Sequence, residues 1–389
     1  MRLLLDNCYF NSPGAITIQK ELITSLVESL PMNSEVLLAY NSGERITGKL
    51  DTNCICMMNH PRNSWLSRWK WYNIQLPRIA KDYNVDVVFS LSGILSTAIK
   101  KYFGTVITIN NMEPFTYNNY DLYPKISKDL IRLFILRRLY VKNIQLADSI
   151  VLFSKSALDI ISSCAGDISY KTQVSLTGVP RDFNFNMFKP PSNPYMNKPF
   201  IIYFSTIYPY KNHLKLIEAY ANALTLEKNL PDLLIAGIHF DDKLIANIME
   251  KISMYSLNKK IKYLGKLPSK DIPAWLYHAE FNLFPSLIET NSVIIAEIMS
   301  LGGVLACSNI PSIVEVAKNS AIYFDPFSIE SMGDAIINLH SNPEKRKKLS
   351  QRALKRSAEL SWEACGNTIW SAVERAKTEI NIRKGKNAF

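Results

Sequence analysis

The 389-residue chain alternates short, almost continuous apolar runs with segments of helical periodicity. A strand that is apolar along its whole length is buried on both faces, which is typical of parallel sheets covered by helices. The pattern therefore predicts an α/β protein with parallel sheets. In the first half, the expected strands lie in residues 2–9, 34–40, 85–93, 104–110 and 148–154.

A second series of the same kind follows residues 188–200, FKPPSNPYMNKPF, a stretch rich in Pro and Asn that is typical of a linker. Two Rossmann-like domains are expected, in residues 1–190 and 191–370, with their parallel sheets facing across a cleft. Ligands bind beyond the carboxyl ends of such strands, so the cleft is the expected site. The second series of strands is expected in residues 200–206, 232–237, 261–265, 280–286, 303–308 and 320–325.

Other features exclude several classes of protein. The longest apolar stretch, residues 85–109, is interrupted by Lys100 and Lys101, so no membrane-spanning helix is predicted. The amino-terminal residues lack the pattern of a signal peptide. The six cysteines show neither metal-ligand spacing nor a disulfide framework, which favours a cytoplasmic protein with free thiols.

The positive charge is concentrated in one part of the chain. The net charge is +11, and residues 60–142 hold 13 Lys and Arg against 5 Asp and Glu. Such a surface attracts nucleic acid, anionic lipid or a phosphorylated substrate, and a merely solvated basic face is an equal alternative. No nucleic-acid-binding fold is recognisable, so no nucleic-acid partner is expected.

Two stretches within this region combine basic and apolar residues. Residues 65–81 place Trp65, Arg68, Trp69 and Lys70 close together, with Tyr72 at helical spacing from the tryptophans, and residues 128–147 carry the Arg137–Arg138 pair beside a strongly apolar face. This composition is typical of a helix at a membrane interface, and the alternative is a core-facing helix with a wet basic side. We therefore expect peripheral association with anionic membranes.

Two glutamates flank a turn in LFPSLIETNSVIIAEIMSLGG, residues 283–303. A helix should begin near Asn291 or Ser292, both good N-cap residues. Eight helical steps advance about 12 Å, too far for the carboxylate pair of a retaining glycosidase, which needs about 5 Å. Glu289 and Glu297 instead suit two contacts on one elongated ligand, with phosphates at the helix N-terminus between them. A nucleotide sugar has this form.

The surrounding sequence resembles the family 4 retaining glycosyltransferases, which have the GT-B fold. The similarity covers nearly the whole chain and is strongest in IKYLGKLPSKDIPAWLYHAEFNLFPSLIET and AEIMSLGGVLACSNIPSIVEVAKNSAIYFDP. STIYPYKNHLKLIEAY resembles the lysine-bearing loop and helix of the family, and TGVPRDFNFNMFKP its segment before the linker. SWEACGNTIW resembles its terminal helix, which implies that residues 371–389 cross back to the first domain.

The resemblance implies a role for several residues. Glu289 matches the glutamate that contacts the donor sugar, and Glu297 matches the glutamate that holds the ribose hydroxyls. Lys211 matches the lysine that neutralises the diphosphate. Gly14, in the turn after the first strand, matches the glycine loop that faces the donor. Without the resemblance, Glu289 and Lys211 are ordinary loop residues and Glu297 is a buried carboxylate paired with a lysine or arginine.

The chain also departs from the family pattern. Thr206 stands where the family has an arginine five residues before the lysine. Thr290, Asn291 and Ser292 replace the usual Gly-Phe-Gly after the first glutamate, although their backbone amides remain candidates for contact with the diphosphate or sugar. Asn110 stands where the family commonly has a histidine, and asparagine cannot carry a proton. Arg181 is a weak candidate to replace the missing arginine.

The resemblance implies a retaining hexosyltransferase. Its donor would be a nucleoside-diphosphate sugar and its acceptor a glycan or lipid-linked glycan, with the acceptor hydroxyl entering near Asn110 and Glu113. No Asp-x-Asp sequence occurs, which agrees with a site without metal or other cofactor. The expected setting is bacterial surface polysaccharide synthesis at the inner face of the cytoplasmic membrane. The alternative is a catalytically impaired relative that binds sugar nucleotides or acts as a scaffold.

Overall fold

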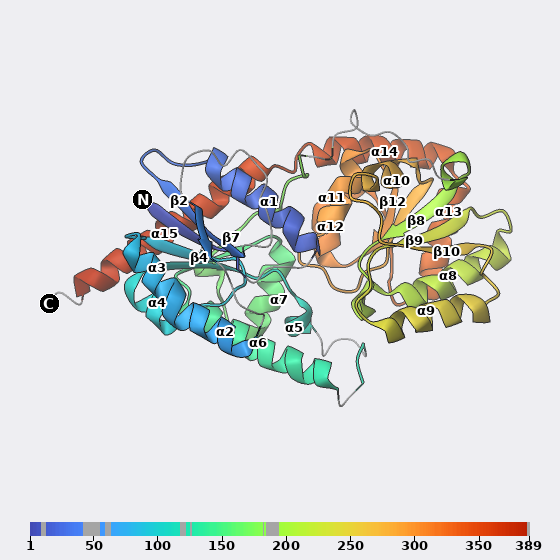
Figure 1. Ribbon diagram of the computed structural model, residues 1–389. Helices are drawn as coiled ribbons and strands as arrows, with labels where there is room; N and C mark the ends of the chain where they lie inside the picture. The colour runs from blue at the N-terminus through green and yellow to red at the C-terminus, as the bar shows by residue number, and fades with distance from the viewer. Residues whose placement is uncertain are drawn as a thin grey trace. The chain divides into compact units, whose positions relative to one another are not determined.

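The computed structural model of the protein describes residues 1–8, 13–41, 55–58, 64–116, 122–124, 127–181, 183 and 194–386. They group into two units: unit 1 is Met1–Gly178 with Ser361–Phe389, and unit 2 is Val179–Leu360. Each unit contains one parallel sheet covered by helices (Figure 1). The sequence analysis predicted domain boundaries at residues 190 and 370, and residues 188–193 of the predicted linker lie outside the described residues.

The sheet of unit 1 has seven strands in the order β3-β2-β1-β4-β5-β6-β7, and every described pair is parallel. Each predicted apolar run of the first half contains one strand. β3 and β7 were not predicted, because they are edge strands of four and three residues and β7 is partly exposed. The strands are β1 (Arg2–Asp6), β2 (Glu35–Asn41), β3 (Ile55–Met58), β4 (Val87–Ser90), β5 (Gly104–Thr108), β6 (Ser149–Leu152) and β7 (Thr172–Val174).

Serine side chains begin several helices of unit 1. Ser96, Ser127 and Ser154 each accept a hydrogen bond from the amide three residues later, which satisfies one of the free amides of a helix start. The helices are α1 (Pro13–Glu28), α2 (Trp65–Lys70), α3 (Leu76–Asp82), α4 (Thr97–Tyr102), α5 (Glu113–Thr116), α6 (Lys128–Leu146), α7 (Lys155–Ala165) and α15 (Trp362–Lys386). A π-helical turn (Trp71–Gln75) joins α2 to α3.

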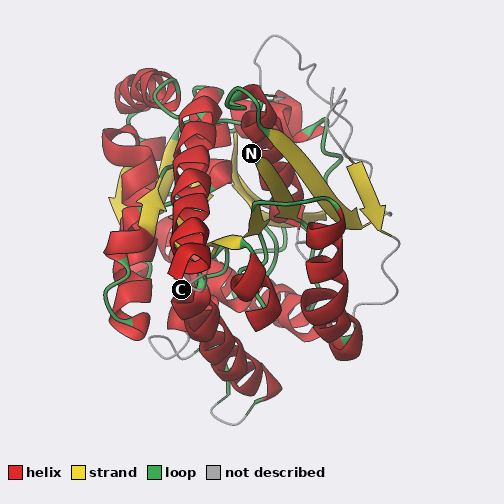
Figure 2. Cartoon of the chain, turned by 90° about the vertical axis from the view of Figure 1, so that its left-hand side faces the viewer, coloured by secondary structure: helices red, strands yellow, loops and turns green. Residues whose placement is uncertain are grey.

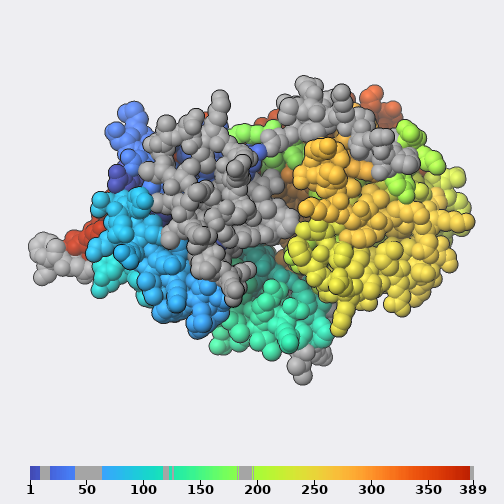
Figure 3. All heavy atoms as spheres, viewed as in Figure 1, coloured from blue at the N-terminus to red at the C-terminus, as the bar shows by residue number. Residues whose placement is uncertain are grey.

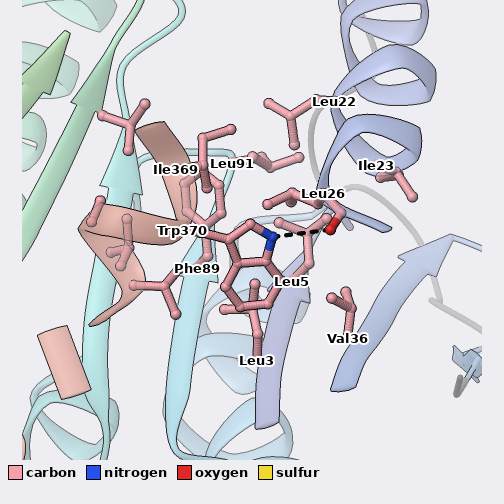
Figure 4. Packing of buried hydrophobic residues seen from close by; sticks show 14 of the residues in the cluster. Leu3, Leu5, Leu22, Ile23, Leu26, Val36, Phe89, Leu91, Ile369 and Trp370 are labelled. Atoms are coloured by element: carbon pink, nitrogen blue, oxygen red, sulfur yellow. Dashed lines mark hydrogen bonds between the residues drawn. The ribbon is translucent and has the colours of Figure 1, made fainter. Parts of the chain in front are cut away.

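The carboxyl-terminal helix α15 belongs entirely to unit 1, where it packs beside α1 and along β4–β7 (Figure 2). The indole ring of Trp370, a residue of α15, is buried among Leu3, Leu5 and Phe89. Its Nε1 donates to the Leu26 carbonyl at 3.0 Å (Figure 4). A Cβ at Gly104 would lie 2.6 Å from the Ala376 carbonyl oxygen, so only glycine allows this approach of α15 to β5.

Two ion pairs near the end of α15 fix it further. Lys377 pairs with Asp86, and Arg383 pairs with Asp148. Arg383 Nη2 also donates to the carbonyls of Lys100 and Phe103, each at 3.1 Å. The final helix therefore completes the core of the first unit although it follows the second in sequence.

Unit 2 contains a six-stranded parallel sheet in the order β10-β9-β8-β11-β12-β13. The strand order reverses at β8, as in doubly wound sheets that bind nucleotides beyond the carboxyl ends of their strands. The strands are β8 (Phe200–Phe204), β9 (Asp232–Ala236), β10 (Ile261–Gly265), β11 (Phe281–Phe284), β12 (Leu305–Ser308) and β13 (Ile322–Phe324), and all six fall within predicted runs.

The helices of unit 2 cover this sheet. α8 packs against α13, and α11 packs against α12 and α14. The helices are α8 (His213–Leu226), α9 (Asp242–Met254), α10 (Ile272–His278), α11 (Val293–Ser300), α12 (Pro311–Ala317), α13 (Ile329–His340) and α14 (Pro343–Ser357). α11 begins directly after Ser292, which confirms the predicted helix start.

Candidate active site

The loops that follow β8 and β11 meet at the carboxyl edge of the sheet in unit 2. The two strands are neighbours and parallel, so their ends lie at the same edge. The amide of Leu287 donates to the Tyr210 carbonyl at 2.8 Å, and Ser286 Oγ donates to the same carbonyl at 3.5 Å. These bonds connect the loop that carries Lys211 to the loop that carries Glu289.

Lys211 and Glu289 form an ion pair, with 2.5 Å between Lys211 Nζ and Glu289 Oε1. Only 14% and 11% of the two side chains is exposed, so both charges are largely shielded from water. Lys211 Nζ also lies 5.1 Å from the centre of the Phe284 ring and 5.4 Å from that of Tyr210. The structure therefore brings together the two residues predicted to be catalytic and holds the ammonium in a fixed position.

A left-handed turn places Lys211 at this point. Asn212 has φ = +62°, a conformation that asparagine tolerates better than most residues, and α8 begins at the next residue. Asn212 Nδ2 donates to the Pro326 carbonyl at 2.8 Å, and the Tyr203 hydroxyl donates to the Lys211 carbonyl at 2.8 Å. These bonds fix the backbone on both sides of the lysine side chain.

His213 is a buried residue of this site that the sequence reasoning missed. Its ring lies 4.6 Å from that of Tyr203, and its Nε2 lies 3.3 Å from Ser205 Oγ. Burial, with a smaller contribution from the Lys211 charge, lowers the pKa of His213 to about 3. The imidazole is therefore neutral at physiological pH and supports the Lys211 turn. The only sequence signal was a histidine two positions after the predicted lysine.

The start of α11 carries a polar side chain that makes no hydrogen bond within the described residues. Ser292 occupies the N-cap position but makes no capping bond, and its Oγ is buried without a partner among the described residues. Val293 donates its amide to the Asn291 carbonyl at 3.1 Å, so the chain is tightly turned here. The segment between Glu289 and the first turn of α11 thus consists of Thr290, Asn291 and Ser292. The sequence analysis predicted that their backbone amides contact the diphosphate or the sugar.

Glu297 lies inside α11 and is 8% exposed. Burial raises the pKa of its carboxyl to about 8. In the part of the chain that the structure describes, no lysine, arginine or hydrogen-bond donor reaches this carboxyl group. The alternative of a buried carboxylate paired with a cation is therefore wrong for these residues. A carboxyl group without a partner is costly to bury, which is typical of a group that a ligand completes.

Thr206 lies in the loop after β8, on the same edge as Lys211. The neighbouring strand β9 ends at Ala236, and the next residue, Gly237, has φ = +146°. A Cβ there would lie 1.8 Å from the Ser205 carbonyl oxygen, so glycine alone permits this close approach of the two loops. Threonine therefore occupies the position of the family arginine at a tightly packed point of the edge.

The remaining predicted site residues belong to unit 1. Gly14 is the second residue of α1, so the prediction that it lies in a turn before the helix is wrong, because the helix already begins at Pro13. Asn110 follows β5 and its Nδ2 donates to the Leu91 carbonyl at 3.2 Å. Glu113 begins α5, is 7% exposed and accepts a hydrogen bond from the Tyr123 hydroxyl. Burial raises the pKa of Glu113, and the bond from Tyr123 opposes this shift.

Asp6 ends β1 and is a second buried carboxyl of unit 1 that the sequence reasoning did not single out. Its Oδ1 accepts from Trp71 Nε1 at 3.0 Å, and its Oδ2 accepts from Ser90 Oγ at 3.4 Å. Burial raises the pKa of Asp6 to about 6. An aspartate at the end of an apolar strand was its only sequence signal.

The basic stretch of residues 65–81 divides between surface and core. Trp65 and Trp69 are 76% and 51% exposed, whereas Trp71 is fully buried. Tyr72 is also buried, and its hydroxyl lies 2.6 Å from Ser92 Oγ. The prediction that Tyr72 shares a face with the two exposed tryptophans is therefore wrong, because the π-helical turn that starts at Trp71 directs both residues into unit 1.

The described part of the chain lacks two further features. No group of three His, Cys, Asp or Glu side chains able to hold a metal ion occurs among the described residues. No helix in the described part of the chain combines the length and apolarity needed to cross a membrane. The cysteines Cys8, Cys164, Cys307 and Cys365 are free thiols.

The second unit is similar to known proteins. Residues 184–356 match the family model of glycosyl transferases group 1. O-antigen chain mannosyltransferase B of Escherichia coli is 27% identical over 168 residues, which is 43% of this chain and 43% of the length of that protein. Residues 184–356, which match the family model, contain Lys211, Glu289 and Glu297.

Solved structures share the architecture of nearly the whole chain. HepE from Anabaena, in complex with UDP and glucose, has a TM-score of 0.72 at 14% identity, covering 96% of this chain and 99% of HepE. Sucrose-phosphate synthase from Thermosynechococcus elongatus has a TM-score of 0.75 at 13% identity, covering 96% and 98%. WaaG, a glycosyltransferase involved in lipopolysaccharide biosynthesis, has a TM-score of 0.67 at 13% identity, covering 98% and 99%. These similarities show a common fold.

Proposed function

The chain has the GT-B fold and carries a domain of the group 1 glycosyltransferases, and from this premise we propose that it transfers a sugar from a nucleoside-diphosphate sugar to a hydroxyl group of a glycan or lipid-linked glycan. The observation that carries this proposal is the shielded Lys211–Glu289 ion pair beside the start of α11. The pair combines one cation for a leaving diphosphate with one carboxylate for the sugar.

Lys211 and the start of α11 would stabilise the departing diphosphate. Breaking the bond to the anomeric carbon leaves negative charge on the diphosphate and positive charge on the sugar. Lys211 Nζ is already held by Glu289, so it can share its hydrogen bonds between this carboxylate and a phosphate without a large movement. The first amides of α11 would add the positive end of the helix dipole.

Glu289 and Glu297 would contact opposite ends of the donor. Glu289 would accept hydrogen bonds from the sugar near the reacting carbon, and Glu297 would accept them from the ribose hydroxyls. Hydrogen bonds from hydroxyl groups favour the ionised carboxylate, so a bound ribose would lower the pKa of Glu297 from about 8. Gly14 would allow the donor to approach the backbone of unit 1.

The finer assignments are extensions of this proposal. Retention of the anomeric configuration and hexosyl specificity rest on the family resemblance. Because Lys211 and the α11 amides supply positive charge for the diphosphate, the reaction would need no metal. Activity that persists after treatment with a metal chelator would support this assignment, whereas loss of activity that Mg²⁺ or Mn²⁺ restores would contradict it.

The acceptor would belong to a surface polysaccharide pathway, for which the similarity to an O-antigen mannosyltransferase is the support. Its hydroxyl would enter near Asn110 and Glu113. Because α2 exposes two tryptophans and α6 exposes several cations, the protein would bind peripherally to the cytoplasmic face of an anionic membrane, where a lipid-linked acceptor is available.

A donor-hydrolysis assay tests the central proposal. The protein is incubated with a panel of nucleoside-diphosphate sugars, and slow release of nucleoside diphosphate without acceptor is the expected result. Binding of a sugar nucleotide, seen as a raised melting temperature without any hydrolysis or transfer, would instead support the catalytically impaired relative. The absence of the family arginine at Thr206 makes this comparison necessary.

Titration calorimetry separates the roles of the two glutamates. Glu297→Ala should weaken the binding of free nucleoside diphosphate, because the ribose loses its acceptor. Glu289→Ala should reduce turnover and leave the affinity for the diphosphate nearly unchanged. Equal losses of diphosphate affinity in both variants would contradict this division of roles.

A further inference from the structure

A solvent-open cavity of about 440 Å³ lies between α6 and α7, within unit 1. Its lining includes three cations of α6, Arg137, Arg138 and Lys142, and the thiol of Cys164 on α7. No acidic residue lines it. The cavity is separate in sequence from every residue assigned to the donor or the acceptor hydroxyl.

The positive charge of this cavity is uncompensated within the described residues. Arg137 Nη2 donates to Cys164 Sγ at 3.1 Å, and sulfur is a weak acceptor. The Arg138 guanidinium lies 4.4 Å from the centre of the Phe134 ring. The acid at the start of α6, Asp129, lies 3.8 Å from Arg132 and does not line the cavity. Two guanidinium groups and an ammonium without carboxylates match the oxygen atoms of a phosphate group.

The same helix exposes apolar side chains next to these cations. Ile131, Ile135 and Leu139 recur every four residues and are 58%, 59% and 36% exposed, and Phe134 at the cavity wall is 43% exposed. Residues four apart lie on one face of a helix, so the three aliphatic side chains form a stripe. Figure 3 shows the part of unit 1 that contains α6, in teal, at the surface of that unit. A soluble phosphate compound gives no reason for such a stripe.

We propose that the cavity binds the phosphate of an anionic phospholipid headgroup, while the apolar stripe of α6 enters the boundary between headgroups and acyl chains. This inference rests on the membrane association in the proposed function and adds to it a site with one lipid per protein. A diffuse basic surface attracts lipid through the number of its charges, whereas this cavity positions donors around one phosphate.

Alkylation of Cys164 reports on the cavity directly. The intact protein is treated with N-ethylmaleimide, and mass spectrometry of peptides follows the modification of this one thiol. A short-chain phosphatidylglycerol, below its micelle concentration, should slow the alkylation at least about threefold, because a bound headgroup covers the Arg137–Cys164 wall. A short-chain phosphatidylcholine and inorganic phosphate should have much smaller effects. Equal alkylation rates with and without phosphatidylglycerol would overturn the proposal.

Vesicle binding with matched variants supplies a second test. Arg138→Gln removes a cavity cation, and Arg132→Gln removes one exposed cation of the same helix outside the cavity. With vesicles of phosphatidylglycerol and phosphatidylcholine, Arg138→Gln should raise the lipid concentration for half-maximal binding about tenfold or more, as expected for a charge-assisted hydrogen bond. Arg132→Gln should raise it about fivefold or less, the effect of one nearby charge.

The outcomes distinguish the cavity from membrane docking in general. Equal losses in the two variants would show a diffuse basic surface, so membrane docking would stand and the cavity site would fall. Failure of the wild-type protein to bind anionic vesicles would overturn the docking, and protection of Cys164 by the short-chain lipid would then still support the headgroup site. Arg137→Gln repeats the comparison if Arg138→Gln does not fold.

Discussion

Buried carboxyl groups lie at the carboxyl edges of both sheets, but their surroundings differ. In unit 1, Asp6 accepts hydrogen bonds from Trp71 and Ser90, and Glu113 accepts one from Tyr123. In unit 2, Glu297 is buried without any partner in the described chain, shortly after Glu289 of the Lys211–Glu289 ion pair in sequence. The buried carboxyl groups of unit 1 accept hydrogen bonds from neutral donors of the same unit. Among the described residues, Glu297 in unit 2 has no such donor, so a ligand would have to supply it.

The largest expected effect is on Glu297, whose folded-state pKa of about 8 lies above its ordinary value of 4.5. The folded protein therefore keeps a proton that the unfolded chain releases, so stability is fully present below pH 4.5 and is lost as pH rises through 8. Glu297→Gln removes this loss. It should raise the free energy of unfolding without ligand by up to roughly 5 kcal/mol at pH 8.5, and by much less at pH 5.

Urea denaturation at the two pH values measures this difference. Glu250→Gln, at an exposed position of α9, is the matched control. Its free energy of unfolding should differ from that of the wild type by nearly the same small amount at both pH values. If Glu297→Gln is less stable than the wild type at pH 8.5, then Glu297 has a stabilising partner. The buried carboxyl groups of the two units would then not differ in this respect.

The second effect is on the ion pair. Lys211→Ala should reduce the rate of donor turnover by about 10² or more, because the departing diphosphate loses its fixed cation. Lys215→Ala, four residues along on α8, should turn over donor at a nearly normal rate, since its Nζ donates to the Phe327 carbonyl and takes no part in the Lys211–Glu289 ion pair. Near-normal activity of Lys211→Ala would mean that Lys211 supports the loops and does not act on the donor.

In unit 1, a substitution beside a buried carboxyl should lower the free energy of unfolding, whereas Glu297→Gln in unit 2 should raise it. Trp71→Phe removes the indole donor of Asp6 and should lower the free energy of unfolding by about 2 kcal/mol or more. The pKa of Asp6, already about 6, should rise further. Because a raised carboxyl pKa costs stability as pH rises, the loss should be larger at pH 7.5 than at pH 5.

Urea denaturation of Trp71→Phe at these two pH values is the measurement. An equal loss at both would show that the indole contributes packing alone and that its hydrogen bond to Asp6 adds nothing measurable. Trp69→Phe, on the exposed side of α2, is the control and should leave stability nearly unchanged.

The smallest effect is expected at Tyr123, which donates to Glu113 from a half-buried position. Tyr123→Phe should cost about 1 kcal/mol of stability, the typical net value of one hydrogen bond. Thermal unfolding followed by circular dichroism is sufficient to detect it. A stabilised variant would indicate that the hydrogen bond from Tyr123 does not stabilise Glu113, and that Glu113, like Glu297, lacks a stabilising partner in the absence of ligand.

Much of the fold was predictable from the sequence. Strands that are apolar along their whole length are typical of a sheet covered on both faces. Such runs, for example LLL after Arg2 and LFP before Ser286, alternate with helices along the chain and therefore predicted the fold class. The start of α11 after Ser292 was also predictable, because helix starts depend on neighbouring residues. The family resemblance then selected Lys211, Glu289 and Glu297 from a chain with many charged residues.

Tertiary structure alone decided which of these residues have partners. Lys211 and Glu289 are 78 positions apart, and their contact depends on β8 and β11 being neighbours, which no local pattern encodes. Likewise, Trp69 and Trp71 are nearly adjacent in sequence, but the π-helical turn exposes one and buries the other. Local sequence determines periodicity and helix ends through nearest neighbours, whereas the environment of a charge or an indole depends on elements that meet only after the chain has folded.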